Sequence, residues 1–347
     1  MQFHAASWTV REYSPADFEG LSELFTIVFG ASRPLAHSLW KFRDNPAGPG
    51  IGVLAVDSGR IVGQYMLMPA LLRLGGDVVL GAQSLDTMTH PDYRKQGMFI
   101  RLARACYELA AEKGVKALYG FPNAESYWGF VRRLNWDHVT DIPCWVRFIR
   151  PGTLTSIPDV LKPLGALGLR ARARLLPKGK NSPHGIVISS ERPSENDLKT
   201  LLEDWRNSEG SCKVERSFVW YRWRFEPTSQ VNYVWATAYR DGRAVSWAVY
   251  GTREWRKSSG MIDIMGCDPD ALEAVTSYAV READRRGLSN LLALTNDPLQ
   301  VRALKACGFV QRGAMPLIVR SMTAGNLGGN IHDPVSWRVS SADTDTF

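Results

Sequence analysis

The same order of sequence patterns occurs twice along the 347-residue chain. The segments WKFR (residues 40–43) and YRWR (residues 221–224) are each followed, after two residues, by a proline and then by two apolar runs joined by a Ser-Gly or Asp-Gly pair. Such runs predict a β-hairpin. In both halves the pattern continues with a strand, an amphipathic helix, a short apolar strand and an Asn-initiated helix. Five matched elements in one order indicate a duplicated domain.

The repeat sets the expected domain boundaries. We expect a first domain in residues 1–150, a basic linker with Pro and Gly in residues 151–190, a second domain in residues 191–323 and a tail without firm structure in residues 324–347. The segment GLRARARLLPKGKNSPHG (residues 168–185) carries part of the net charge of +7. No aromatic interleaving or nucleic-acid motif accompanies it, so we favour a solvated linker over a nucleic-acid surface.

The stretch THPDYRKQGMF (residues 89–99) lies between a predicted strand and a predicted helix. Pro91 ends the strand because it cannot donate to the ladder, and apolar residues recur at helical spacing from Met98 until Gly114. The first N–H groups of such a helix lack intrahelical partners, and Gly97 would let a ligand approach them. Further donors precede the glycine: Arg94, Lys95 and Gln96. The loop therefore predicts an anion site suited to a pyrophosphate, the alternative being a polar turn with incidental charges.

In this setting the segment RKQGMF (residues 94–99) resembles the Gln/Arg-x-x-Gly-x-Gly/Ala signature of the GNAT acyltransferase family. The segment FPNAESYWGFVRRLNW (residues 121–136) is similar to that family's later Asn-started helix. The resemblance covers the first half closely and the second half as a weaker copy. It implies an α/β (α+β) fold of two tandem GNAT-like domains, each a mixed, mostly antiparallel sheet flanked by helices.

The resemblance also implies an acyl-CoA donor, with acetyl-CoA as the first expectation, and no metal. The loop would hold the pyrophosphate of coenzyme A through Arg94, Lys95, Gln96, Gly97, Met98 and Phe99. The splayed fourth strand would hold the pantetheine and thioester through Thr87, Met88 and Thr89, and Asn123 would touch the donor from the end of the fifth strand.

Two departures from the family pattern affect the expected chemistry. Phe99 replaces the usual small residue at the third signature position, which narrows the adenine-phosphate end or requires a different helix position. Phe130 and Val131 stand where many relatives carry a tyrosine that protonates the leaving thiolate, and neither can donate a proton. Tyr127, with Ser126 beside it, is the nearest hydroxyl in sequence and becomes the candidate acid.

Acyl transfer to an amine also needs a group that accepts a proton. Asp86 is the carboxylate that the fourth strand presents close to the expected thioester, and Glu125 is the second candidate. The alternative for Asp86 is a strand-end residue hydrogen-bonded to turn amides. No Gly-x-Ser-x-Gly motif occurs, so we expect direct transfer in a ternary complex without an acyl-enzyme.

The second copy departs from the first at its strand-to-helix loop, GCDPDALEAV (residues 266–275), which has no Arg-x-x-Gly. Its carboxylates suit a helix start but repel a phosphate: Asp268, Asp270 and Glu273. We therefore expect one acyl-CoA site per chain, in the first domain, and a degenerate second domain.

Composition limits the remaining possibilities. No run of 18 or more apolar residues and no secretory signal pattern occurs, so we expect a cytoplasmic protein without a membrane partner. The five cysteines form no C-x-x-C pair and predict free thiols rather than a metal site. The predicted function is acyl-CoA-dependent N-acyltransfer to a primary amine of a small molecule, an amino sugar or amino acid derivative. The alternative is a catalytically inactive tandem GNAT-like binding or scaffold protein.

Overall fold

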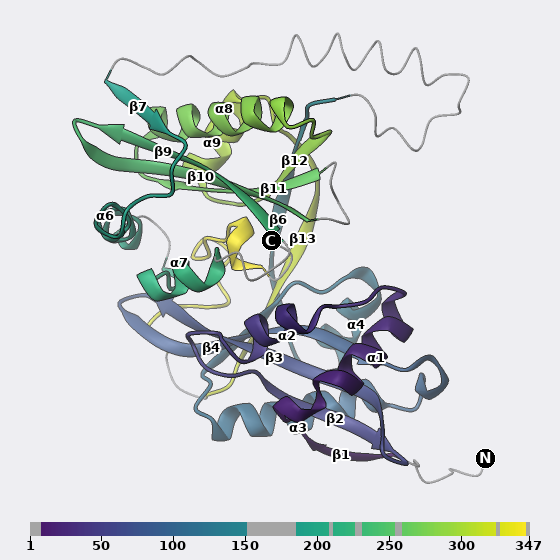
Figure 1. Ribbon diagram of the computed structural model, residues 1–347. Helices are drawn as coiled ribbons and strands as arrows, with labels where there is room; N and C mark the ends of the chain where they lie inside the picture. The colour runs from purple at the N-terminus through teal and green to yellow at the C-terminus, as the bar shows by residue number, and fades with distance from the viewer. Residues whose placement is uncertain are drawn as a thin grey trace. The chain divides into compact units, whose positions relative to one another are not determined.

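The computed structural model describes residues 8–150, 185–207, 211–225, 231–253, 259–323 and 327–344. The chain divides into two compact units, whose elements are labelled in Figure 1. Unit 1 comprises Met1–Asp141, Gly210–Ser229 and Pro316–Trp337, and unit 2 comprises Ile142–Glu209, Gln230–Met315 and Arg338–Phe347. Residues 151–184 of the predicted linker, with nearly all of its basic segment, lie outside the described residues.

Unit 1 is built on a sheet with the strand order β1-β2-β3-β4-β5-β13, and β8 pairs with one end of β3. Neighbouring strands pair antiparallel except β4 and β5, which are parallel. The strands are β1 (Thr9–Glu12), β2 (Ile51–Asp57), β3 (Arg60–Leu74), β4 (Asp77–Thr89), β5 (Ala117–Gly120), β8 (Cys212–Val214) and β13 (Val310–Ser321).

Helices cover both faces of the unit 1 sheet, with α1 and α2 on one face and α3 on the other (Figure 1). α3 begins directly after Gly97 and ends before Gly114, as its sequence pattern predicts. Its buried stripe, which includes Leu102 and Cys106, shares one core with α4 and the strands. The helices are α1 (Phe18–Phe29), α2 (Leu35–Phe42), α3 (Met98–Glu112), α4 (Ala124–Arg133), α7 (Phe218–Arg224) and the short 3-10 turns η1 (Pro15–Asp17) and η2 (Pro91–Tyr93).

Unit 2 repeats this plan with the strand order β6-β12-β11-β10-β9-β7, in which β11 and β12 form the parallel pair. Its strands are β6 (Asp137–Phe148), β7 (Ile186–Ser189), β9 (Val231–Arg240), β10 (Arg243–Arg253), β11 (Ser259–Gly266) and β12 (Asn290–Leu294). Its helices are α6 (Glu195–Arg206), α8 (Pro269–Arg285), α9 (Pro298–Ala306) and the 3-10 turn η5 (Ser341–Asp343). The predicted fold class, α/β with mixed, mostly antiparallel sheet structure flanked by helices, is confirmed.

Both predicted hairpins are present and use the same kind of turn. Ser58 and Gly59 join β2 to β3 with φ angles of 48° and 80°, and Asp241 and Gly242 join β9 to β10 with φ angles of 50° and 76°. Two successive positive φ angles are typical of the type I′ turn, whose twist matches that of the flanking strands. The hairpins therefore support the duplication at the level of the backbone.

Each unit is completed by a strand from the other half of the chain. β13, which follows α9, pairs Ile318–Ser321 with Ala117–Gly120 of β5 in unit 1. β6, which follows α4, pairs Cys144–Phe148 with β12 in unit 2. The predicted boundaries at residues 150, 190 and 323 follow the order along the chain, whereas the units follow contacts. Those boundaries stay a prediction.

The expectation of a tail without firm structure is wrong for residues 327–344. Trp337 is 2% exposed and packs near Tyr119 in unit 1, and residues 341–343 form η5 in unit 2. These residues are held by turns and side-chain hydrogen bonds rather than by a helix or strand, and such structure leaves no periodic pattern in the sequence.

Candidate acyl-CoA site in unit 1

β4 and β5 separate in the middle of the unit 1 sheet. Their parallel pairing runs from Gly81 and Ala117 to Ser84 and Gly120, where β5 ends, while β4 continues to Thr89. The predicted donor-binding residues Thr87, Met88 and Thr89 all lie on this continuation. Beyond Ser84 the backbone groups on that edge of β4 are directed at the opening rather than at a neighbouring strand, so they can hydrogen-bond an extended ligand.

A β-bulge places Asp86 at the start of this opening. Gln64 and Met66 of β3 pair with Met88 and Leu85 of β4, so β4 carries one extra residue in this interval. Asp86 has a left-handed backbone with φ 48°, and the Nε2 of Gln64 donates to its carbonyl oxygen at 2.7 Å. A left-handed conformation is costly for a residue other than glycine and concentrates at functional sites.

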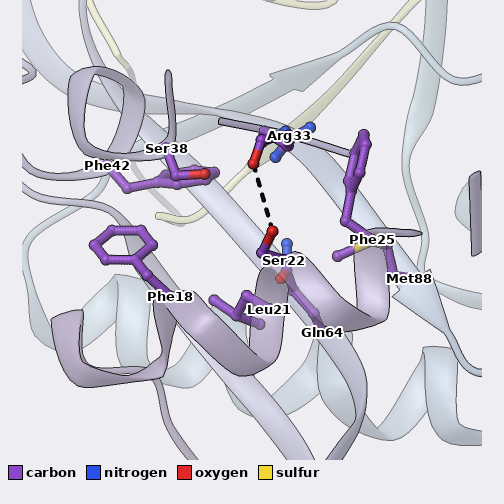
Figure 2. A pocket seen from close by; sticks show the side chains of 9 residues that line it. All are labelled: Phe18, Leu21, Ser22, Phe25, Arg33, Ser38, Phe42, Gln64 and Met88. Atoms are coloured by element: carbon purple, nitrogen blue, oxygen red, sulfur yellow. Dashed lines mark hydrogen bonds between the residues drawn. The ribbon is translucent and has the colours of Figure 1, made fainter. Parts of the chain in front are cut away.

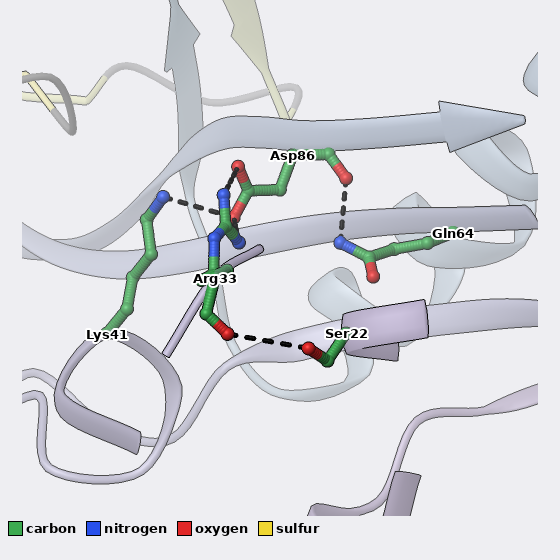
Figure 3. A network of polar contacts seen from close by, with 5 residues as sticks. All are labelled: Ser22, Arg33, Lys41, Gln64 and Asp86. Carbon is green, nitrogen blue, oxygen red and sulfur yellow. Dashed lines mark hydrogen bonds and ion pairs between the residues drawn. The ribbon is translucent and has the colours of Figure 1, made fainter. Parts of the chain in front are cut away.

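The side chain of Asp86 is held by two cations (Figure 3). The Nη1 and Nη2 atoms of Arg33 donate to its two carboxylate oxygens at 2.6 and 2.8 Å, and the Nζ of Lys41 donates to Oδ2 at 3.1 Å. The side chains of Asp86, Arg33 and Lys41 are 8%, 14% and 1% exposed. Burial by itself raises the pKa of Asp86, but the charges of Lys41 and Arg33 and their hydrogen bonds outweigh it and hold the pKa well below its usual range.

This network bears on the predicted role of Asp86 as a proton acceptor. A carboxylate whose pKa is lowered by two cations binds a proton weakly, so it is a poor general base near neutral pH. The geometry favours a second role, in which Asp86 fixes Arg33 and Lys41 beside the opening. Glu125, the other candidate, is exposed in the first turn of α4.

A pocket opens beside the Asp86 network, between α1, α2 and the bulged strands (Figure 2). It is a small, partly open hollow, with about 260 Å³ of space between its atoms when the open solvent at its mouth is included. Met88 forms part of its wall and also lies on the separated part of β4, so the pocket adjoins the opening. The lining residues are apolar or aromatic (Phe18, Leu21, Phe25, Phe42, Met88) and polar (Ser22, Arg33, Ser38, Gln64).

The predicted anion-binding loop is exposed at the N-terminus of α3. Residues 94–97 are all exposed, and Lys95 and Gly97 have left-handed φ angles of 63° and 76°. Gly97 is the N-cap of α3 and supplies no side-chain cap, so the first N–H groups of this 15-residue helix lack that partner. A Cβ built on Gly97 would have no heavy atom within 4 Å. These residues therefore fit a pyrophosphate: Arg94 and Lys95 add charge, and the open backbone admits a close approach.

The large residue at the third signature position is accommodated on the side of α4. The ring of Phe99 meets Phe130 edge-on at 5.2 Å and lies against Gly129, where an added Cβ would come within 2.8 Å of the ring. Phe130 is 6% exposed and belongs to the core, and neither phenyl ring carries a proton that it could donate. Phe99 thus packs α3 onto α4 in this chain.

The predicted acid, Tyr127, has a partner that the sequence did not indicate. A 2.9 Å hydrogen bond joins its hydroxyl to Nδ1 of His138, and Nε2 of His138 lies 3.7 Å from Oδ1 of Asp141. The side chain of His138 is 33% exposed, so this chain of contacts runs from Tyr127 on α4 to side chains that solvent reaches. Asn123 caps α4, where its Oδ1 accepts from the backbone N–H of Ser126 at 2.9 Å.

Sequence patterns alone had brought together the strand residues, the loop and α4, but not Arg33, Lys41, His138 or Asp141. Lys41 is the second residue of WKFR, and a basic residue, Arg222, stands at the same position of YRWR. This repeated basic position is a signal that could have drawn attention to Lys41. The other contacts join residues of different elements without a shared motif, and they depend on the fold. Among the described residues no cluster of His, Cys, Asp or Glu is arranged to hold a metal ion. No described helix is both long and apolar enough to cross a membrane.

Comparisons with known proteins agree with this geometry. Residues 9–139 match the family described as "Acetyltransferase (GNAT) domain". No curated protein sequence matches the chain. Similar solved structures include a GCN5-related N-acetyltransferase from Anabaena variabilis ATCC 29413, with 11% identity, a TM-score of 0.63 and coverage of 91% of this chain and 73% of that one.

Two further similar structures carry informative descriptions. N-myristoyltransferase from Saccharomyces cerevisiae with bound myristoyl-CoA has 13% identity, a TM-score of 0.63 and coverage of 91% of this chain and 83% of that one. The glucosamine N-acetyltransferase region of a fungal multi-domain β-N-acetylglucosaminidase has 14% identity, a TM-score of 0.59 and coverage of 92% of this chain and 38% of that one. At these identities the similarity shows a shared fold.

Proposed function

We propose that the chain, whose residues 9–139 match a GNAT acetyltransferase domain, is a transferase that moves an acyl group from acyl-CoA to a primary amine of a small molecule. The observation that carries this proposal is the uncapped, open N-terminus of α3 next to the separation of β4 and β5. The thioester of acyl-CoA supplies an activated acyl group for the amine. Acetyl-CoA is the donor to test first.

In the proposed arrangement the two ends of the donor are held by different parts of unit 1. Arg94, Lys95 and Gln96 and the N–H groups at Gly97, Met98 and Phe99 would bind the pyrophosphate. Backbone groups of Thr87, Met88 and Thr89 would bind the pantetheine and polarise the thioester carbonyl, since preorganised N–H groups stabilise a developing oxyanion. Asn123, at the end of β5, would lie beside the same arm.

The pocket beside Asp86 would take the acceptor. Its mixture of aromatic and polar lining residues suits an amine whose body has both an apolar face and polar groups, as amino sugars and amino acid derivatives do. One solved structure with this fold is described as a glucosamine N-acetyltransferase, which is in keeping with an amino sugar. Tyr127 would protonate the departing thiolate, and Glu125 is the carboxylate that could accept the proton of the amine.

Thermal unfolding with and without excess acetyl-CoA tests the donor site. At a concentration a hundredfold above the dissociation constant, binding stabilises the folded chain by about 2.7 kcal/mol. For units of this size that amounts to a rise in Tm of roughly 2–4 °C. Gly97→Glu should abolish the rise, because the new carboxylate repels the pyrophosphate and covers the open backbone.

Gly114→Glu is the matched control. Gly114 lies at the other end of α3, also has a left-handed φ (82°), and also has no heavy atom near an added Cβ, so the two substitutions impose a similar backbone cost. The control should keep the full rise in Tm. If the wild type shows no rise with acetyl-CoA or longer acyl-CoA donors, the proposal fails. Binding without release of free thiol in the presence of candidate amines would favour the inactive binding protein instead.

A further inference from the structure

Unit 2 has an opening between β11 and β12 that corresponds to the opening between β4 and β5. The parallel pairing of β11 with β12 runs from Ser259 and Asn290 to Met261 and Leu292, and β11 then continues to Gly266. α8 follows β11 as α3 follows β4, and α9 follows β12 as α4 follows β5. The place that we assign to the pantetheine arm in unit 1 therefore has a counterpart in unit 2.

Each opening has a buried aspartate beside it, although the two are not at equivalent positions. Asp263 pairs with Val249 of β10 as Leu85 pairs with Met66 of β3, and Asp86 is the next residue, in the bulge of β4. Both carboxylates are buried, but their surroundings differ. Asp86 is held by Arg33 and Lys41, whereas Asp263 is engaged by the C-terminal segment of the chain.

The C-terminal segment lies in the opening of unit 2 and bonds to both separated strands. The Oγ of Ser341 donates to the carbonyl oxygen of Ile262 in β11 at 2.7 Å and accepts from the N–H of Leu294 in β12 at 2.9 Å. Ser341 is 1% exposed. One buried hydroxyl thus satisfies a backbone group on each side of the opening, where an extended ligand would otherwise bind.

Neighbouring residues of the segment extend this contact along the opening. The Oγ of Ser340 and the N–H of Ala342 both donate to Oδ1 of Asp263, at 2.5 and 3.1 Å. The N–H of Val339 donates to Oδ1 of Asn296 at 2.9 Å. Asn296 follows β12 as Asn123 follows β5, so the segment reaches the unit 2 counterpart of a residue that we place in the unit 1 site.

The helix start next to this opening is also closed to a phosphate. Asp268 caps α8, where its Oδ1 accepts from the N–H groups of Asp270 and Ala271 at 3.0 Å each. Its other oxygen accepts from Arg240 at 2.9 Å. At the start of α3 in unit 1 no side chain caps the first N–H groups, whereas at the start of α8 in unit 2 the carboxylate of Asp268 caps the corresponding N–H groups.

We infer that residues 339–344 are an intramolecular ligand of the β11–β12 opening and exclude acyl-CoA from unit 2, so that each chain binds one acyl-CoA. The exclusion rests on the proposed function, because it concerns the same donor. The presence of the segment in the opening is independent of the proposed function. The two parts are therefore tested by separate measurements.

Amide hydrogen exchange tests the occupancy. Ser341→Ala removes both bridging hydrogen bonds, and the N–H of Leu294 and the amides of residues 340–344 should then exchange at least about tenfold faster than in the wild type. Ser246→Ala is the control, since it removes a buried hydrogen bond to the carbonyl oxygen of Met265 in β11 away from the segment. Exchange that is fast at Leu294 in the wild type, or unchanged by Ser341→Ala, overturns the inference. If Ser341→Ala does not fold, Ser340→Ala removes the bond to Asp263 instead, and the amides of residues 340–344 should again exchange faster than in the wild type; unchanged exchange there overturns the inference.

Calorimetric titration with acetyl-CoA tests the exclusion. We expect a stoichiometry of one per chain for the wild type and no binding for Gly97→Glu. Two equivalents per chain, or a site that survives in Gly97→Glu, overturns the exclusion. If the wild type binds no acetyl-CoA, the proposed function fails, and hydrogen exchange still decides whether the segment fills the opening.

Discussion

Asp86 combines a left-handed backbone, a nearly buried side chain and two cationic partners, and each of these features depends on the others. The φ of 48° would be unfavourable alone, but the bulge, the Gln64 bond and the Arg33 and Lys41 ion pairs fix it. Buried charges are costly unless they are paired, so the three charged side chains stabilise the site only as a set.

Replacing Asp86 with asparagine should therefore destabilise unit 1 by about 3 kcal/mol, because it leaves two nearly buried cations without this carboxylate. Denaturant unfolding would measure the loss. Asp44→Asn is the control, since its ion pair with Arg43 is exposed on both sides and should change stability by less than about 1 kcal/mol. Equal effects of the two substitutions would contradict the assigned role of Asp86.

A comparison of the wild type with Asp86→Asn also predicts how the free energy of unfolding depends on pH. The pKa of Asp86 is lowered in the folded state, so its contribution is fully present above the unfolded pKa of about 3.9 and is lost as the pH falls toward the lower folded pKa. The stability difference between wild type and Asp86→Asn should be constant from about pH 5 to pH 8 and should shrink below about pH 4. A difference that changes near pH 7 would point to another titrating group.

Tyr127 and His138 allow a kinetic prediction. If Tyr127 protonates the leaving thiolate, Tyr127→Phe should lower kcat by roughly a hundredfold, the lower range for a general acid, and leave acetyl-CoA binding unchanged. His138→Phe removes the 2.9 Å hydrogen bond to the hydroxyl and should lower kcat by a smaller factor, and the double substitution should be no worse than Tyr127→Phe alone. Release of free thiol measures kcat, and Tyr239→Phe, whose hydroxyl bonds Asp197, is the control.

At the scale of elements, α7 positions α2. The indoles of Trp40 and Trp223 stack at 4.8 Å and 13°, and the Nε1 of each donates to the backbone carbonyl oxygen of the other at 2.8 Å. Lys41 follows Trp40 directly, so the pair also fixes the helix that carries a cation to Asp86. This explains why residues 210–229 belong to unit 1, although their sequence copies the start of the first half.

Trp223→Ala should accordingly destabilise unit 1 by about 3–5 kcal/mol, through lost packing and a backbone carbonyl left without its donor. Trp223→Phe keeps most of the packing and should cost about 1–2 kcal/mol, chiefly for the hydrogen bond. Trp128→Ala is the control, because Trp128 is 54% exposed on α4. Denaturant unfolding separates these cases, and a loss for Trp223→Ala no larger than that for Trp128→Ala would contradict the assignment.

The elements themselves were largely predictable, but their partners were not. Alternating apolar runs and turn residues predicted both hairpins, and three- and four-residue spacing predicted α3, because these patterns are local. The pairing of β13 with β5 and the contact of α7 with α2 join segments far apart in the sequence. Within the site, the loop at residues 94–97 carries a local motif, whereas Arg33 reaches Asp86 across 53 positions without one.

At the scale of the whole chain, the exchange of β6 and β13 links the two halves. The core of unit 1 includes Ile318, which is fully buried and lies on β13, together with residues of β3 and α3. The sheet edge of β5 is covered by the same strand. Unit 1 therefore takes part of its core and one edge of its sheet from residues far beyond the predicted boundary at residue 150.

This dependence predicts that a fragment of residues 1–150 will not fold cooperatively. The fragment lacks Ile318 and leaves β5 as an open edge, which favours association with other chains rather than a stable monomer. Circular dichroism during heating should show no cooperative unfolding transition for this fragment, and acetyl-CoA should not raise its thermal stability. Co-expression with residues 185–347 is the control, because that fragment supplies β13, α7 and β8, and it should restore both signals. A monomeric fragment 1–150 that unfolds cooperatively and gains stability from acetyl-CoA would instead favour the boundary predicted from the sequence, since unit 1 would then need neither β13 nor α7.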